Sequence, residues 1–233
     1  MSKQFTALLP MKGHSERAPG KNIRPLAGRP LCLWILETLA DCGQVAEILV
    51  NTDSEGIREA VQSQPKTRVL DRPEEICGDL VPMNDIISHD LAFAGTGHII
   101  QTHATNPFLS PATLETALAA YLEALPEHDS LFTVTARHSR FYWPDGRPAN
   151  HDPAELLRTQ DLTPLYEENS CLYIFSPASF QAAGSRRIGL RPLLFPMPKL
   201  EALDIDDEED FSLAEALVAG RDIRPGRAER GQP

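Results

Sequence analysis

FTALLPMKGHSERAPGKN, residues 5–22, places a short apolar run directly before a loop of glycine, proline and basic side chains. The run FTALLP ends at a proline and is typical of a buried strand. The loop has no apolar periodicity, and it carries Lys12, Arg17 and Lys21, with Arg24 just beyond. A strand that leads into a basic loop containing glycine favours a site for an anionic ligand.

Outward from this loop, strand-like apolar runs alternate with segments of helical periodicity. Besides the first strand, strands are expected in the stretches 46–54, 67–73, 98–107, 130–138 and 170–176. Helices are expected in the stretches 31–43, 54–62, 83–95 and 110–125, and 201–220 is expected to be a strand entering a helix. This alternation predicts an α/β fold with a mostly parallel sheet covered on both faces. Ligands of such sheets bind at the carboxyl ends of the strands, where the polar runs meet.

The composition is that of an ordinary globular chain, with 233 residues, 42% hydrophobic and 24% charged. The net charge of −11 argues against general nucleic-acid affinity. The N-terminal apolar run is too short for a signal peptide, and no later run approaches a membrane span. The four cysteines form no CxxC pair, which favours reduced thiols. We therefore expect a cytoplasmic protein without nucleic-acid or membrane partners.

One long segment interrupts the alternation of strands and helices. Residues 137–168 are rich in proline, aspartate and arginine, and they are too long for a simple loop. We interpret them as an inserted arm or small lobe that makes a homodimer contact. The range 1–222 is expected to form one domain with this arm, and the tail 223–233, which has almost no apolar residues, is expected to be disordered.

The loop at 10–22 matches neither of two common phosphate-binding templates. The spacing of Gly13 from Gly20 is too long for a P-loop, Asn22 replaces the Ser or Thr of that motif, and GxGxxG is absent. The glycines and backbone N–H groups would still suit an anion nest. From composition alone, the alternative is a solvated surface loop whose bases balance acidic neighbours.

Several ordered blocks resemble the CMP-sialic acid synthetase family, the acylneuraminate cytidylyltransferases. The loop and the KNIRPLAGRPL stretch are similar to the family's Arg-x-x-Ser-Lys-Gly-x-x-x-Lys-Asn and Pro-Leu-x-Gly-x-Pro-Leu patterns. Further similar blocks follow in the family's order: ILVNTDSEGI, VLDRPEEICGD, EENSCLYIFSPASF and LDIDDEEDFSLAEAL. The resemblance spans residues 5 to about 218 and implies a Rossmann-like, three-layer nucleotidyltransferase fold. It also implies transfer of CMP from CTP to the anomeric hydroxyl of a 2-keto-3-deoxy sugar acid, with release of pyrophosphate.

The same resemblance implies which residues bind the nucleotide. Lys12, Ser15 and Lys21 match the positions that handle the triphosphate, and these three are expected to act in catalysis. In the same loop, Gly13 would let the backbone approach the phosphates closely and Arg17 would supply charge. Lys12 stands where the family has Arg, which keeps the charge but loses the bidentate geometry. Asn22 and Arg72 match residues that line the nucleotide side.

The acidic stretch DIDDEED has two interpretations. Asp204 and Asp206 match the family's paired aspartates that hold Mg²⁺, and Asp206 is expected to act in catalysis. Their i, i+2 spacing on a strand would put both carboxylates on one face, where they can share an ion with substrate phosphates. The alternative is an acidic helix start, in which Asp207 caps the helix and Asp210 completes a capping box. Both hold if different residues play the two parts.

The acceptor half of the site departs from the family. His103 stands where the family has Gln, and it could bond a substrate hydroxyl or carboxylate and carry charge near neutral pH. Its alternative is a strand-end histidine bonded to backbone. Asn169 matches a substrate-binding position, but Glu167 and Glu168 precede it, and a carboxylate there would repel a sugar acid. The alternatives are therefore a phosphorylated, phosphonate or other sugar-acid acceptor, or a catalytically silent nucleotide-binding protein.

Overall fold

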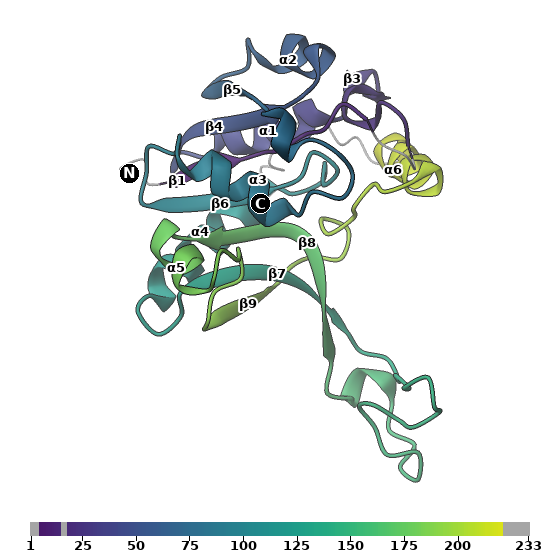
Figure 1. Cartoon of the computed structure of the whole chain (residues 1–233). Coiled ribbons are helices and arrows are strands. Elements are labelled where there is room, and N and C mark those ends of the chain that lie inside the picture. Colours follow the sequence, from purple (N-terminus) through teal and green to yellow (C-terminus); the bar gives the residue numbers. More distant parts are fainter. Residues whose placement is uncertain (1–4, 15–17, 221–233) are drawn as a thin grey trace, which may run out of the picture.

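The computed structural model describes residues 5–14 and 18–220 and contains a seven-stranded sheet of order β5-β4-β1-β6-β8-β7-β9 (Figure 1). The strands are β1 (Phe5–Leu8), β4 (Val45–Thr52), β5 (Thr67–Asp71), β6 (His98–Thr102), β7 (Ser130–Arg137), β8 (Leu165–Phe175) and β9 (Pro192–Pro196). Neighbouring strands are parallel except where β8 pairs with β6 and β7. The prediction of a mostly parallel sheet is confirmed.

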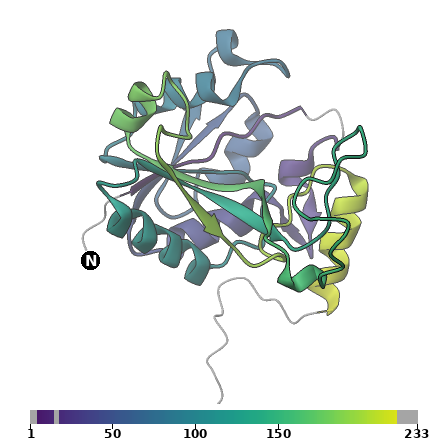
Figure 2. The same cartoon turned by 90° about the horizontal axis from the view of Figure 1, so that it is seen from below.

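Helices cover both faces of this sheet (Figure 2). The larger apolar cluster joins one face to α1 (Cys32–Asp41), α2 (Glu55–Val61) and α4 (Pro111–Ala124). A second cluster joins the other face to α3 (Met83–Leu91) and α5 (Pro177–Ala182). Within β1, Ala7 belongs to the first cluster and Leu8 to the second, because successive side chains of a strand point to opposite faces. These three layers confirm the expected fold class.

A smaller packed unit at one side of the sheet brings the two halves of the chain together. It contains the 3₁₀ turn η1 (Lys21–Ile23), the short strands β2 (Pro25–Leu26) and β3 (Arg29–Pro30), and α6 (Glu208–Gly220). Its apolar cluster is formed by Leu26, Leu31, Trp34, Ile205, Phe211 and Ala214. The packing of this cluster fixes the chain just after the basic loop beside the chain just before α6.

The prediction of a strand before α6 is wrong. Residues 203–206 have no regular secondary structure, and they lie along the loop after β6, where the Ile205 N–H donates to the Thr105 carbonyl at 2.9 Å. The alternating pattern of LDID buries Ile205 against α6 rather than against the sheet. The sheet edge beside β7 is instead formed by β9, which the sequence analysis missed along with α5. Prolines at both ends of β9 suit an edge strand.

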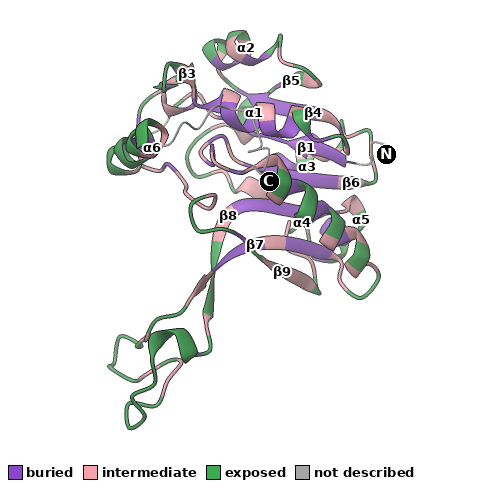
Figure 3. Ribbon diagram, turned by 180° about the vertical axis from the view of Figure 1, so that it is seen from behind, coloured by how far each residue is buried: buried purple, intermediate pink, exposed green. Residues whose placement is uncertain are grey.

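Residues 138–164 leave the sheet between β7 and β8 and project away from it (Figure 1). This arm contains the turn η3 (Thr159–Asp161) and is largely exposed, in contrast to the buried strands (Figure 3). The range 137–168 that we interpreted as an inserted arm overlaps this segment, but its last four residues belong to β8. The tail 223–233, for which we expected disorder, lies outside the described residues.

The cysteines form no disulfide; Cys32, Cys42 and Cys171 are buried, and Cys77 is partly exposed. Burial raises the pKa of the Cys32 thiol to about 11. Burial also raises the pKa of Cys42 and Cys171, so the three buried thiols are protonated at neutral pH. Within the described ranges, no helix is both long enough and apolar enough to span a lipid bilayer.

Candidate active site

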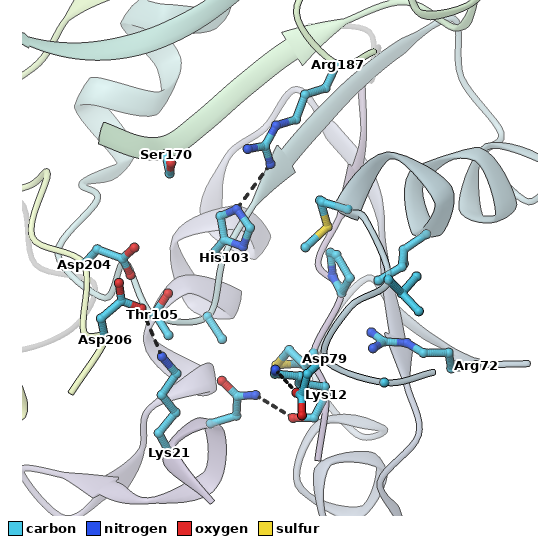
Figure 4. Close-up of a pocket in the computed structure, with 18 residues that line it drawn as sticks. Lys12, Lys21, Arg72, Asp79, His103, Thr105, Ser170, Arg187, Asp204 and Asp206 are labelled. Atoms are coloured by element: carbon cyan, nitrogen blue, oxygen red, sulfur yellow. Dashed lines mark hydrogen bonds and ion pairs between the residues drawn. The ribbon is translucent and has the colours of Figure 1, made fainter. Parts of the chain in front are cut away.

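A cavity of about 550 Å³ opens beside the carboxyl ends of β1 and β6, the edge at which α/β sheets bind ligands (Figure 4). Its walls include the loops after β1, β5 and β6 and the segment before α6. It brings together most of the residues that the sequence analysis singled out: Lys12, Lys21, Asn22, Arg72, His103, Asp204 and Asp206.

One corner of the cavity joins a lysine to two aspartates. The Lys21 ammonium donates to the Ile205 carbonyl at 2.8 Å and lies 3.4 Å from Asp206 Oδ1. Ile205 is buried between two residues whose side chains line the cavity, because the extended backbone alternates their directions. Asp204 and Asp206 therefore share one wall even though they do not lie on a strand.

Asp204 has the features of a cation ligand. Burial is the main cause that raises the pKa of this carboxyl, and a hydrogen bond from Thr105 opposes the effect. Among the described residues, its buried Oδ1 has no hydrogen-bond partner. A divalent cation would supply the missing charge partner, so the pair fits Mg²⁺. The described part of the chain holds no cluster of three or more His, Cys, Asp or Glu side chains suited to a metal, so substrate phosphates and water would complete the coordination.

The remaining acids of this stretch serve the start of α6. Asp207 Oδ1 accepts from the backbone N–H groups of Glu209 at 2.9 Å and Asp210 at 3.0 Å. Asp210 Oδ2 accepts in return from the N–H groups of Asp206 and Asp207. This reciprocal arrangement is the capping that the sequence predicted, and it separates the helix cap from the cavity-lining pair.

A second wall carries Arg72 and Lys12. Arg72 is buried and donates from Nε to Asn51 Oδ1 at 2.7 Å and from Nη2 to the Asn51 carbonyl at 3.0 Å. Asn51 in turn donates to the buried Asp90 carboxylate, so Asn51, itself held by Asp90, fixes the guanidinium. Lys12 pairs with Asp79 at 2.5 Å, and Asn22 Nδ2 donates to the Lys12 carbonyl at 3.0 Å. Asn22 therefore orients the backbone of the basic loop.

Gly13 has a packing reason to be glycine. A Cβ at this position would lie 2.7 Å from Ser54 Cβ, and the Gly13 N–H already donates to Asp53 Oδ1 at 2.7 Å. The close approach is therefore to the loop after β4, and Gly13 does not line the cavity. Ser15 and Arg17, both expected at the triphosphate, lie outside the described residues.

His103 lines the cavity next to Arg187. Burial and the nearby Arg187 charge lower the pKa of His103 to about 4, so the expectation of charge near neutral pH is wrong. Its Nε2 is 3.2 Å from Gln101 Nε2 and 3.5 Å from Arg187 Nη1. Both neighbours are donors, so Nε2 accepts and the neutral ring carries its proton on Nδ1. His103 can thus give a hydrogen bond without adding charge.

Asn169 does not reach the cavity. Its Oδ1 accepts from the Thr133 hydroxyl at 2.6 Å and its Nδ2 donates to Thr135 Oγ1 at 3.2 Å. The ladder between β7 and β8 is irregular at this point, and the amide of Asn169 bridges the two strands there. The next residue, Ser170, has a positive φ of 56° and lines the cavity instead.

Sequence reasoning missed Asp79, Ser170 and Arg187, which all line the cavity. Asp79 follows Gly78 in the stretch ICGDL, and an acid directly after a glycine is the one local feature that could have pointed to it. Arg187 lies in the loop between α5 and β9, neither of which was predicted, so nothing tied it to the carboxyl edge of the sheet.

The chain belongs to the cytidylyltransferase family, whose sequence profile matches residues 6–228. It is 29% identical to an N-acylneuraminate cytidylyltransferase of Oncorhynchus mykiss, a match that covers 93% of this chain and 50% of that protein. It is 27% identical to a CMP-N,N'-diacetyllegionaminic acid synthase of Legionella pneumophila, over 92% and 96% of the two chains. These matches confirm the resemblance found in the sequence. The chain spans about half the length of the curated N-acylneuraminate relatives that it matches.

A solved structure of CMP:2-keto-3-deoxy-manno-octonic acid synthetase complexed with CTP has the same fold. The TM-score is 0.67 at 16% identity, and the superposition covers 93% of this chain and 99% of that one. The Rossmann-like α/β architecture is thereby confirmed.

We predict that His103 stays neutral at pH 5. Its folded pKa of about 4 lies below the ordinary 6.5, so the unfolded chain binds the proton first as the pH falls. The stability that His103 contributes is therefore present above pH 6.5 and is lost as the pH falls toward 4. NMR titration of the imidazole, assigned with a His103→Gln variant, measures the midpoint. A midpoint near 6.5 would show that the ring is solvated.

Proposed function

We propose that this chain transfers CMP from CTP to the anomeric hydroxyl of a 2-keto-3-deoxy sugar acid and releases pyrophosphate. One observation carries the proposal: a single cavity is lined by Lys12, Lys21 and Arg72 together with the pair Asp204 and Asp206, in a chain whose net charge is −11. The family, and relatives named as cytidylyltransferases or synthases of CMP-linked sugar acids, support the same reaction.

The reaction requires that the charge on the phosphates is neutralised and that the two substrates are positioned. The acceptor oxygen bonds to the α-phosphorus while the bond to the bridging oxygen breaks, pyrophosphate leaves with that electron pair, and the hydroxyl proton is released. Lys12 and Lys21 would neutralise the charge that builds on the phosphates. Arg72 and Asn22 would line the nucleotide side. Arg72 needs no reorganisation to do so, because Asn51 already holds its guanidinium.

Asp204 and Asp206 would hold Mg²⁺ at the corner next to Lys21. The ion would supply Lewis-acid neutralisation of the phosphate oxygens. Lys21 lies 3.4 Å from Asp206 and reduces the repulsion between the two carboxylates. Lys21 would therefore both offset the charge of the two aspartates and bind the proposed triphosphate.

We also propose that residues 1–222 act as one catalytic domain and that the arm contacts a second copy of the chain. Tyr142, Trp143 and Leu156 are exposed on the arm, and a homodimer would cover such apolar side chains.

The free cysteines suit a reducing compartment, so we place the reaction in the cytoplasm.

Pyrophosphate release tests the reaction and the part of Lys21 together. We expect the wild type to release pyrophosphate from CTP with N-acylneuraminate or 3-deoxy-manno-octulosonate. Lys21→Ala should lower kcat/KM by about 2–4 kcal/mol in transition-state free energy, because it removes a preorganised cation from the phosphates.

Lys199→Ala is the matched control, since Lys199 is exposed and does not line the cavity. Its rate should equal that of the wild type. Release with neither acid would refute the proposed reaction, and a wild-type rate for Lys21→Ala would remove this lysine from the chemistry.

Asp206→Asn should lower turnover by about 100-fold or more, because it weakens a hard-ligand pair for Mg²⁺ without changing the side-chain volume. Asp207→Asn is the control: Asp207 caps α6, and Asn also caps helices, so turnover should stay within about twofold of wild type. Rates are measured across a Mg²⁺ titration. Equal losses in the two variants would point to the helix start rather than to a metal site.

A further inference from the structure

Arg187 enters the cavity from the loop between α5 and β9, and the roles proposed for Lys12, Lys21 and Arg72 leave it unused. It lies at one end of the cavity and Lys12 and Lys21 lie at the other, with His103 between them and next to Arg187 (Figure 4). The wall therefore carries a cation at a distance from the proposed triphosphate groups.

Two cross-strand partners hold the guanidinium. Gln101 on β6 faces Tyr173 on β8 in the sheet register, and both are fully buried. Arg187 donates from Nη1 to Gln101 Oε1 at 2.7 Å and from Nη2 to the Tyr173 hydroxyl at 2.9 Å. Its Cζ lies 3.6 Å from the centroid of the Tyr173 ring. The Arg187 N–H donates to Asn84 Oδ1 at 3.3 Å, which ties the loop to the start of α3.

The charge of Arg187 is only weakly compensated. Its side chain is 19% exposed, and the two groups that accept its short hydrogen bonds are neutral. Within the described ranges, its one ion pair is with Glu168, at 3.9 Å, and that carboxylate also accepts from the Tyr173 hydroxyl. A cation held mostly out of water without a close counter-ion costs free energy. An anion that enters the cavity would offset this cost.

We propose that Arg187 binds the carboxylate of the acceptor substrate. A planar guanidinium pairs with a carboxylate through two parallel hydrogen bonds, and Gln101 and Tyr173 fix its plane in advance. His103, neutral and protonated on Nδ1, is the adjacent donor for an acceptor oxygen. This inference rests on the proposed function. It adds that the acceptor is recognised by its carboxylate and that Arg187 selects it.

The proposal also accounts for the two acids that precede Asn169. Glu167 is exposed and pairs with Arg137 at 2.6 Å, away from the cavity lining. Glu168 accepts a hydrogen bond from the Tyr173 hydroxyl and lies 3.9 Å from the Arg187 guanidinium. Its negative charge is therefore partly offset by Arg187. Neither acid therefore prevents a sugar acid from binding.

Equilibrium binding tests the assignment without relying on turnover. Titration calorimetry with N-acylneuraminate and 3-deoxy-manno-octulosonate, at saturating CTP and with Mg²⁺ omitted so that the substrates do not react, is compared for wild type, Arg187→Gln, Arg187→Lys and Arg186→Gln. We expect Arg187→Gln to weaken acid binding by about 10- to 100-fold, the range for losing a charge-assisted hydrogen-bonded pair. The affinity of Arg187→Lys for the acids should lie between those of wild type and Arg187→Gln, because lysine keeps the charge but cannot form two parallel hydrogen bonds.

Arg186 is the matched control, because it donates to the Ala183 carbonyl and does not line the cavity. Arg186→Gln should bind the acids as wild type does, and the Kd for CTP should be the same in all four proteins. A merely structural role for Arg187 would instead shift the Kd for CTP as well. An analogue with the carboxylate converted to an amide should bind wild type and Arg187→Gln equally.

The assignment is overturned if Arg187→Gln binds the acids as tightly as wild type, or if wild type binds neither acid. Binding of a phosphonate such as 2-aminoethylphosphonate, dependent on Arg187 and without acid binding, would also overturn it. Pyrophosphate release is followed in parallel. Arg187-dependent acid binding without any release would refute the proposed reaction and leave the carboxylate site intact.

Discussion

The site depends on one contact between distant parts of the chain: the Lys21 ammonium bonded to the Ile205 carbonyl, 184 residues away. This contact forms because the turn after the basic loop and the segment before α6 pack into the same apolar cluster. Burial of Ile205 turns Asp204 and Asp206 toward the cavity, and Lys21 offsets their charge. A loop after the first strand and a segment before the last helix thus become one corner of a cavity.

The cavity is electrostatically divided, although the chain as a whole is acidic. Lys12 and Lys21 lie toward one end and Arg187 toward the other, and His103 lies between them without charge. A neutral donor at this position adds no repulsion toward the cationic side chains of Arg187 and Lys21. Such an arrangement suits two anionic substrates bound side by side, the geometry that transfer between a nucleotide and a sugar acid requires.

Local sequence signals predicted the elements whose pattern decides their structure. α4 begins as expected, because Ser110 caps it and Pro111 follows, and the alternation of strands and helices gave the sheet type. The same logic failed for residues 203–206, because a period of two shows that one face is buried but not against what. Asn169 and Arg187 could not be placed either, since one depends on an irregular strand ladder and the other on a loop between two elements that carry weak patterns.

We propose that the corner around Lys21 and the wall of Lys12 and Arg72 bind one nucleotide. A crystal structure of the protein with CTP and Mg²⁺ would test this. We expect phosphate oxygens in contact with the ammonium groups of Lys12 and Lys21, the cytosine on the side of Arg72, and the end of the cavity at Arg187 left open for the acceptor. A triphosphate bound away from both lysines, or a base stacked at Arg187, would contradict it.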